Sequence, residues 1–382
     1  MDGKVAIVGY AQSKHEGNKD SSREMMIFDV VTDVLKMAGL SKADVDTVIT
    51  AQNDYLDGRT ISNMRTVEPV GAHLKDESKV EMDGAVAALY AYMRILSGDH
   101  DVALVVGSSM ASTYPAYIPG ILTLDVTYDY PMGLLNEVSA AALQATCYME
   151  KYGVSEEEIA KISVKNLRNA AKNPFAMRQM PKITTKKVLG SKMLYSPVRE
   201  LNAYPLTDGA CGILLASEER AEEITDSPVW IEGVGNCQDV YHLGERTLSG
   251  CDSLKLAAEN AYEMAGISNP KREIDLVEVS ENFSHEELIF YEALGLCKEG
   301  EGKKLIDDGI TKIDGELPVN PSGGALSANP LCATGLIRIS EAAMQIRGEA
   351  GGHQVKDVRT SLAHGQTGIC AQENVVFILG GE

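Results

Sequence analysis

The stretch from residue 79 to residue 108 constrains the fold of this chain more than any other. Residues 85–96 are apolar around most of a helical circumference, which predicts a helix that is buried on nearly all sides. Asp83-Gly84 forms the turn before it, and the apolar run at 102–106 is typical of a strand buried on both faces. Free N–H groups and the helix dipole favour an anion at such a turn, so we expect chemistry there.

Strand-like and helix-like segments alternate along the chain in two successive sets, which predicts an α/β fold with parallel or mixed sheets and an internal duplication. We expect an N-terminal half at 1–228 and a C-terminal half at 229–382. Within the first half, the region at about 110–205 begins with a Tyr-, Pro- and Gly-rich stretch without clear period. We expect this region to form a lid or loop over a site.

Composition excludes several classes of protein. The 382 residues carry a net charge of −20, which argues against nucleic acid as a partner. No apolar run reaches about 18 residues, so no membrane span is expected. The N-terminus looks like a strand rather than a signal peptide, which predicts a cytoplasmic protein. The seven scattered cysteines fit reduced thiols, and no CxxC or HxxxH spacing predicts a metal site in this chain.

One segment opposes the overall acidity. Between residues 161 and 192 there are nine basic residues and no Asp or Glu: Lys161, Lys165, Arg168, Lys172, Arg178, Lys182, Lys186, Lys187 and Lys192. They either form a solvated basic face or bind a phosphorylated ligand or acidic partner. Coenzyme A, with three phosphates, would fit this segment, and Arg178, Lys182, Lys186 and Lys187 are the candidate contacts.

Six motifs together resemble the thiolase superfamily, closest to its lipid-transfer or archaeal-type branch. They are VAIVGYAQSKH, YGVSEEEIAKISVKNLRNAAKNPFA, LTDGACGILLAS, IDLVEVSENFSHEELIFYEALGL, VNPSGGALSANPLCATGLIRI and SLAHGQTG. The resemblance covers essentially the whole chain. It implies a duplicated, five-layered α-β-α-β-α thiolase fold, a homodimer, and an acyl-CoA substrate bound under a lid. It also implies a small zinc-ribbon and OB-fold partner subunit.

The sequence departs from the family at nearly every catalytic position. The turn that carries the nucleophilic cysteine in the family has Glu81 instead, and the first cysteine of the chain is Cys147. Ser280 replaces the Asn or His of the family's N-E-A-F or H-D-A-F motif, and Asn329 replaces the active-site His. His364 lies next to the position of the second family cysteine. The usual thiolate nucleophile is therefore missing from its usual place.

We consider these substitutes as candidate catalytic residues, each beside a purely structural alternative. His364 suits an acid–base role because its ordinary pKa lies near neutrality, and Glu81 could also take a proton or only cap the turn. Asn329 could hold a thioester oxygen or only stabilise its loop. Ser280 and Glu281 follow a core strand, where Glu281 could simply orient its neighbours.

Glycines and cysteines add further candidates. Gly323, Gly324 and Gly365 let the backbone approach a ligand closely, and the family uses the matching loops around the thioester and pantetheine. Simple turns are the alternative. Cys332 and Cys370 fall near the matched loops, where an inert buried thiol is the usual case.

Three functions remain open from the sequence. The first is thiolase-like formation or cleavage of a C–C bond next to a CoA thioester, such as thiolysis of a bulky 3-oxoacyl-CoA, without an acyl-cysteine at the usual position. The second is a retro-aldolase acting on a β-hydroxyacyl-CoA, which needs a base and an oxyanion hole but no nucleophile. The third is a catalytically silent subunit of a complex.

Overall fold

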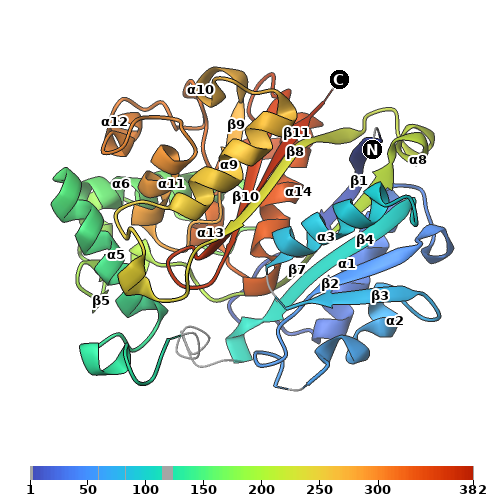
Figure 1. Cartoon of the computed structure of the whole chain (residues 1–382), viewed down its shortest axis with the longest axis horizontal. Helices are drawn as coiled ribbons and strands as arrows, with labels where there is room; N and C mark the ends of the chain where they lie inside the picture. The colour runs from blue at the N-terminus through green and yellow to red at the C-terminus, as the bar shows by residue number, and fades with distance from the viewer. Residues whose placement is uncertain (1–2, 59, 82, 114–123, 382) are drawn as a thin grey trace.

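The fold is built on one mixed sheet of nine strands, seen in the computed structural model of the chain, which describes residues 3–58, 60–81, 83–113 and 124–381 (Figure 1). The sheet order is β3-β2-β4-β7-β1-β8-β11-β10-β9. Its strands are β1 (Val5–Gln12), β2 (Thr47–Ala51), β3 (Asp76–Val80), β4 (Val102–Met110), β7 (Asp208–Ser217), β8 (Val229–Gln238), β9 (Leu276–Glu278), β10 (Thr360–Thr367) and β11 (Glu373–Gly380). A separate short hairpin joins β5 (Met193–Tyr195) to β6 (Val198–Arg199).

The strand pairing repeats about the centre of this sheet. From β1 outward, β7 and β4 are added antiparallel, and β2 and β3 parallel. From β8 outward, β11 and β10 are added antiparallel and β9 parallel, and Val319 then bridges to Val277 of β9 in parallel. Antiparallel pairing of β1 with β8 joins the two sets. The duplication expected from the sequence is therefore visible in the pairing pattern.

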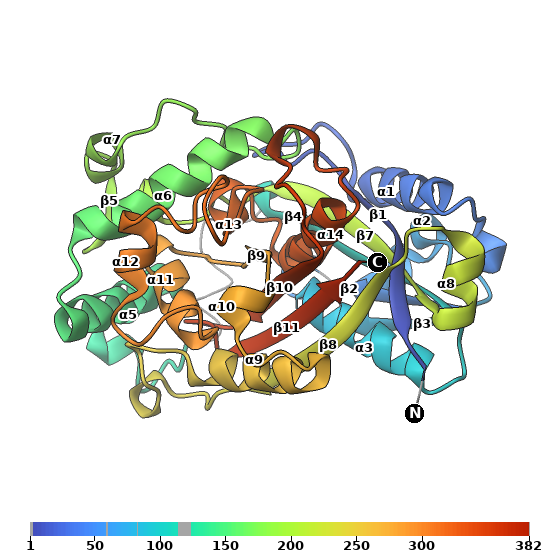
Figure 2. The same ribbon diagram turned by 90° about the horizontal axis from the view of Figure 1, so that it is seen from above.

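The helices complete five layers. Helix α3 (Gly84–Leu96) and helix α14 (Thr334–Ile346) share one apolar cluster with strands of both halves of the sheet, so they form the central layer. The opposite face of the N-terminal half packs on α1 (Arg23–Met37), and that of the C-terminal half on α9 (Asp252–Ala265) and α11 (Ser284–Ala293). In Figure 2, seen from above, α1 and α9 lie on opposite sides of the strands. The predicted α-β-α-β-α fold is confirmed.

The two central helices meet closely where they begin. Helix α14 is buried around nearly its whole circumference, whereas α3 keeps a partly exposed face on which Met93 is 49% exposed. The apolar sequence at 85–96 predicted burial of α3 on nearly all sides, and that prediction is wrong for this face. A Cβ atom on Gly84 would lie 2.6 Å from the Cβ atom of Leu336, so the absence of a side chain at Gly84 permits this contact. The N-termini of α3 and α14 consequently lie side by side in the interior, next to the ends of strands from both halves.

The remaining helices lie between and around these layers. They are α2 (Val67–Val70), α5 (Glu137–Tyr152), α6 (Glu156–Asn169), α7 (Thr185–Leu189), α8 (Glu218–Ile224), α10 (Pro270–Glu273), α12 (Gly302–Asp307) and α13 (Gly324–Ser327). The region at 110–205, expected as a lid, contains α5, α6, α7 and the β5–β6 hairpin, and its part at 114–123 lies outside the described residues. Among the described helices, none is long and apolar enough to cross a membrane.

Candidate active site

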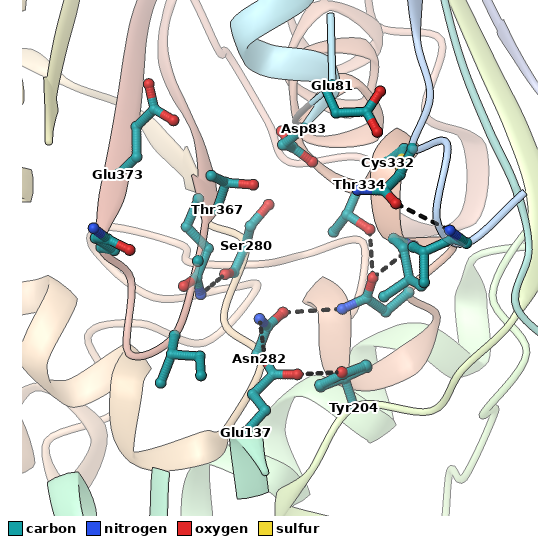
Figure 3. A pocket seen from close by; sticks show the side chains of 18 of the residues that line it. Glu81, Asp83, Glu137, Tyr204, Ser280, Asn282, Cys332, Thr334, Thr367 and Glu373 are labelled. Carbon is teal, nitrogen blue, oxygen red and sulfur yellow. Dashed lines mark hydrogen bonds between the residues drawn. The ribbon is translucent and has the colours of Figure 1, made fainter. Parts of the chain in front are cut away.

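A cavity of about 350 Å³ opens where the N-termini of α3 and α14 meet the ends of β10 and β11 (Figure 3). We call it the central cavity. It is lined by Asn53, Leu56, Glu81, Asp83, Glu137, Tyr204, Gln238, Ser280, Asn282, Asn329, Leu331, Cys332, Thr334, Gln366, Thr367, Gly368, Ile369, Gln372 and Glu373. Its wall thus combines residues from both halves of the duplicated fold and from α5.

Asp83 lies at the point where the two central helices begin. Its carboxylate accepts hydrogen bonds from the backbone N–H groups of Ala85 and Gly335, both at 2.9 Å. A Cβ atom on Gly335 would lie 1.8 Å from Oδ1 of Asp83, and one on Gly365 would lie 2.7 Å from the same atom. Two glycines therefore make room for this side chain, and the free N–H groups of two helices stabilise its charge.

The burial of Asp83 still outweighs these hydrogen bonds in its titration. Desolvation raises the pKa of the Asp83 carboxyl to about 7, although the backbone N–H groups act in the opposite direction. The nearby carboxylate of Glu373 raises it further. Asp83 can therefore gain or lose a proton near neutral pH, as an acid–base group must.

A chain of hydrogen bonds runs along one wall of the cavity. The Thr334 hydroxyl donates to Oδ1 of Asn329 at 2.6 Å, and Nδ2 of Asn329 donates to Oδ1 of Asn282 at 2.9 Å. Nδ2 of Asn282 then donates to Glu137 at 3.1 Å, and the Tyr204 hydroxyl donates to the other oxygen of Glu137 at 2.7 Å. Each donor points toward Glu137, so this carboxylate fixes the orientation of both amides.

Three buried polar atoms of the lining residues have no hydrogen-bond partner among the described residues. They are the Ser280 hydroxyl, Oε1 of Gln366 and Oε2 of Glu373. Buried polar groups are nearly always paired, because an unpaired one costs about 1–3 kcal/mol. A donor, an acceptor and a carboxyl oxygen are therefore available to a bound molecule in this cavity.

The cavity is acidic. Four carboxyl groups line it, those of Glu81, Asp83, Glu137 and Glu373, and no Lys, Arg or His occurs among its described lining residues. Burial raises the pKa of Glu137 and of Glu373. The proton-carrying groups of this cavity are thus carboxyls rather than histidines or thiolates.

Glu81, placed by sequence at the family's cysteine position, lies at the exposed side of the cavity. Its carboxylate accepts from the backbone N–H of Asp54 at 2.6 Å and pairs with Lys79 at 2.7 Å. Asp83, two residues later, is the residue that caps α3. The preference for Asp directly before a helix was a signal for Asp83 in the sequence.

The predicted residues Ser280, Glu281 and Asn329 divide between two environments. Ser280 and Asn329 line the central cavity, but Nδ2 of Asn329 already donates to Asn282. Glu281 points away from the cavity and accepts from Asn166 at 2.8 Å and Asn320 at 2.6 Å. Desolvation and the neighbouring Glu287 raise the pKa of Glu281 to about 8.

His364 does not line the central cavity. It is fully buried on β10, where Nε2 bonds to Oδ1 of Asn374 at 2.9 Å and the ring packs edge-on against Phe290 of α11. Burial lowers the pKa of His364 to about 4. The neighbouring residue in the strand, Ala363, faces the central helices instead. The alternation of side chains along β10 therefore turns His364 toward the outer helix layer.

The predicted glycines serve different purposes. Gly365 lies against Asp83 and Ala85, next to the cavity. Gly323 and Gly324 do not line the cavity and have positive φ angles of 102° and 63°, which favour glycine. A Cβ atom on Gly324 would lie 2.1 Å from Oε1 of Glu281, and one on Gly323 would lie 2.6 Å from Ala170. Close packing explains both.

Of the two cysteines near the matched loops, only Cys332 lines the central cavity among the described residues. Burial raises the pKa of the Cys332 thiol to about 12, and it raises that of Cys370 well above its ordinary value. Both groups are neutral thiols near pH 7, and a thiol is a much weaker nucleophile than a thiolate.

The basic segment lies beside the cavity rather than in it. Arg178 donates to the backbone oxygen of Ala203 at 2.6 Å, next to the lining residue Tyr204. Lys182, Lys186 and Lys187 are exposed. Lys165, by contrast, is buried and pairs with Glu287 at 2.6 Å. The nine cations therefore do not form one uniform surface.

Sequence reasoning did not single out Glu137, Asn282, Gln366 or Glu373. Glu137 lies at the start of a helix in the region expected as a lid, and Glu373 opens the last strand. Neither position carries a recognisable motif, because long-range contacts bring these residues together. Asn282 lies in the stretch that matches the family's N-E-A-F or H-D-A-F motif, where it replaces the alanine.

Comparison with known proteins finds relatives that match nearly the whole length of the chain. A family model described as thiolase C-terminal domain-like matches residues 235–381. An acetyl-CoA acetyltransferase of Methanothermobacter thermautotrophicus is 32% identical over 369 residues, which are 94% of this chain and 95% of that protein. The benzoylsuccinyl-CoA thiolase subunit BbsB of Thauera aromatica is 28% identical over 98% of this chain and 97% of its own length.

A solved structure also matches over nearly the whole fold. The structure of an Ltp2–ChsH2(DUF35) aldolase has a TM-score of 0.86 with this chain at 25% sequence identity. The match covers 99% of this chain and 97% of that chain. The relatives thus include both acyltransferases and an aldolase on the same fold.

Proposed function

Because the chain belongs to the thiolase superfamily as a thiolase-like enzyme of the acyltransferase type, we propose that it acts on a C–C bond next to a CoA thioester. The reaction proceeds without an acyl-cysteine, by acid–base chemistry of carboxyl groups. Aldol-type cleavage or formation of a β-hydroxyacyl-CoA is the form of this chemistry that the cavity supports best.

The observation that carries this proposal is the identity of the proton carriers in the central cavity. Asp83, with a pKa of about 7, lies at the start of two helices, while the lining thiol of Cys332 has a pKa of about 12. An acyl-enzyme needs a thiolate, whereas an aldol cleavage needs only a base, an acid and a donor to the thioester oxygen. The cavity offers the second set of groups.

The proposed aldol cleavage transfers two protons. A carboxylate takes the proton from the β-hydroxyl group, the Cα–Cβ bond breaks, and its electron pair forms the enolate of the thioester while the β-carbon becomes a carbonyl. A carboxylic acid then gives a proton to Cα. Ser280, whose buried hydroxyl has no partner among the described residues, donates to the enolate oxygen.

Direct thiolysis of a 3-oxoacyl-CoA is a second candidate. It is supported by the acetyl-CoA acetyltransferase and the thiolase subunit among the relatives. In this form the thiol of free CoA gives its proton to a cavity carboxylate and attacks the 3-oxo carbon. The Cα–Cβ bond then breaks, and the departing enolate is protonated as before. The two forms differ in whether free CoA is consumed.

Coenzyme A enters as a substrate, with its phosphates on the basic segment at 161–192. Arg178 is bonded to the residue before Tyr204 of the cavity, which supports this placement. Lys182, Lys186 and Lys187 are exposed and available to phosphates. The acidic cavity itself would repel them, so the acyl group, rather than the nucleotide, occupies it.

We also propose that the chain works in an assembly. Strand β3 is at the edge of the described sheet and is partly exposed, a surface that a second copy can cover in a homodimer. BbsB is named as a subunit, and the matched aldolase contains a DUF35 component. These names support a partner subunit for this chain as well, and we propose that it is the small zinc-ribbon and OB-fold subunit that the sequence resemblance implies.

The test is an assay of β-hydroxyacyl-CoA and 3-oxoacyl-CoA substrates, with and without free CoA and with and without a candidate partner subunit. Release of an acyl-CoA and a carbonyl compound without free CoA supports aldol cleavage, and a requirement for free CoA supports thiolysis. Intact-mass spectrometry should detect no acyl adduct. An adduct on Cys332 or Cys370 would overturn the proposal, and inactivity throughout would favour a silent subunit.

A further inference from the structure

We propose that Glu373 is the group that moves the proton at the α-carbon of the acyl-CoA, an inference that rests on the proposed function. Glu373 is the first residue of β11 and is 7% exposed. Its backbone pairs with Gln238 of β8 and with Thr367 of β10, two further residues of the cavity wall. The side chain is thus placed by three strands and not by a mobile loop.

The hydrogen bonds of Glu373 leave half of its carboxyl group available. Oε1 accepts from Nδ2 of Asn236 at 3.2 Å, while Oε2 is buried without a partner among the described residues. A carboxyl with a purely structural role would be expected to have both oxygens paired, as buried polar groups nearly always are. The available oxygen belongs to a residue of the cavity wall, where a substrate can supply the missing partner (Figure 3).

The carboxyl of Asp83 is held differently from that of Glu373. Each of its oxygens accepts a backbone N–H, and Gly335 and Gly365 enclose it. Its position is therefore fixed, whereas Glu373 has a longer side chain and an oxygen without a partner among the described residues. The two carboxyls act on each other electrostatically, which disfavours two charges at once. One carboxylate and one carboxylic acid is the arrangement that aldol cleavage requires.

The steps then divide between the two carboxyls. Asp83, as carboxylate, takes the β-hydroxyl proton; the Cα–Cβ bond breaks; and Glu373, as carboxylic acid, gives its proton to Cα of the enolate. In the synthetic direction Glu373, as carboxylate, removes the α-proton. That half-reaction needs no second substrate, so it can be observed with a simple acyl-CoA alone.

The experiment follows deuterium incorporation from D2O into acetyl-CoA or propionyl-CoA by mass spectrometry. It compares the wild-type chain with Glu373→Gln, Glu373→Asp and the control Glu259→Gln, an exposed residue of α9 outside the cavity. We expect Glu373→Gln to slow exchange by about two to four powers of ten, the usual size of an acid–base contribution. Glu373→Asp should restore part of the rate, and the control should match wild type.

Two further measurements separate proton transfer from structural damage. Calorimetric affinity for acetyl-CoA and the thermal unfolding midpoint should change little in Glu373→Gln, because the amide keeps the shape of the carboxyl. A variant that exchanges as fast as wild type would overturn the role of Glu373 alone. A loss of exchange accompanied by equal losses of affinity and stability, without rescue by Asp, would also overturn it. Absence of exchange in the wild-type chain both with and without the candidate partner subunit would instead refute the proposed function.

Discussion

The loop after β9 lies between a buried ionic cluster, whose carboxyls are fully paired, and the central cavity, where the Glu373 carboxyl is only partly paired. Ser280 and Asn282 point into the central cavity, and Glu281 between them points into a buried ionic cluster. We define this cluster as Lys165, Asn166, Glu281, Glu287 and Asn320. In it, Lys165 pairs with Glu287, and both amides donate to both carboxylates. In the cavity, Oε2 of Glu373 has no hydrogen-bond partner in the part of the chain that the structure describes.

The difference between the ionic cluster and Glu373 is pairing rather than burial. Glu287 is as buried as any carboxyl of the cavity, and the Tyr291 hydroxyl, Lys165 and two amides satisfy it. A paired carboxyl fixes the chain around it: Glu281 accepts from Nδ2 of Asn320 and packs against Gly324. An unsatisfied one is available to a substrate. Perturbed pKa values occur in both groups, so pKa alone does not identify the reactive site.

The largest expected effect on stability comes from removing the cation that pairs with Glu287 in the ionic cluster. Lys165→Met should lower the free energy of unfolding by about 3–5 kcal/mol, because Glu287 would remain buried without its cation. Urea unfolding at pH 7 measures the change. Lys161→Met is the matched control: Lys161 lies one helical turn earlier and makes a partly exposed pair with Asp307. It should cost less than about 1 kcal/mol. Equal costs would refute the distinction.

Asp83 should make stability fall as the pH rises. Its pKa is raised in the folded protein, so above about pH 4 the unfolded chain releases this proton first, which favours unfolding until the folded carboxyl ionises near pH 7. The loss is about 1.4 kcal/mol per pH unit in that interval. Asp83→Asn removes it. Urea unfolding at several pH values should show a smaller decline in the variant than in wild type.

The difference in pH dependence between wild type and Asp83→Asn isolates the contribution of Asp83 from that of other groups. Burial also raises the pKa of Glu286 to about 7, but that residue is present in both proteins and its contribution cancels in the difference. Asn can still accept one backbone N–H at the start of α3, although its amide cannot accept the second. The variant should therefore be less stable at pH 4 while losing less stability by pH 7. An equal decline of unfolding free energy with pH in both proteins would show that folding does not raise the pKa of Asp83.

His364→Ala should reduce stability but not proton transfer. The ring packs against Phe290 and bonds to Asn374, so its removal should cost about 3 kcal/mol of unfolding free energy. The sequence-based acid–base role instead predicts a rate loss of about two to four powers of ten. Deuterium exchange into acetyl-CoA, measured below the unfolding temperature of the variant, separates these outcomes. A rate loss of that size would return His364 to the mechanism.

The sequence predicted the fold better than it predicted the site, for physical reasons. Elements such as α3 and β4 can be predicted from the local pattern of apolar residues. Family motifs drew attention to Ser280 and Asn329, which line the cavity. Side-chain direction is harder to predict. A shift of one residue along β10 decides whether Ala363 or His364 faces the central helices, and no local pattern marked that choice. Glu373 reaches the cavity only through tertiary pairing of β11.

The smallest effect should come from exposed charges, which contrast with both buried groups. Replacing Lys182, Lys186 and Lys187 together by Gln should weaken CoA binding severalfold in low salt, because each exposed contact to a phosphate contributes less than about 1 kcal/mol and is screened. Calorimetry at low and high salt measures this loss.

Lys303→Gln, Lys304→Gln and Lys312→Gln form a matched triple control of equal charge change elsewhere on the chain. Dephospho-CoA, which lacks one phosphate, should show a smaller difference between wild type and the first triple variant. Equal salt dependence in both triple variants would mean that net charge, not this segment, governs CoA binding.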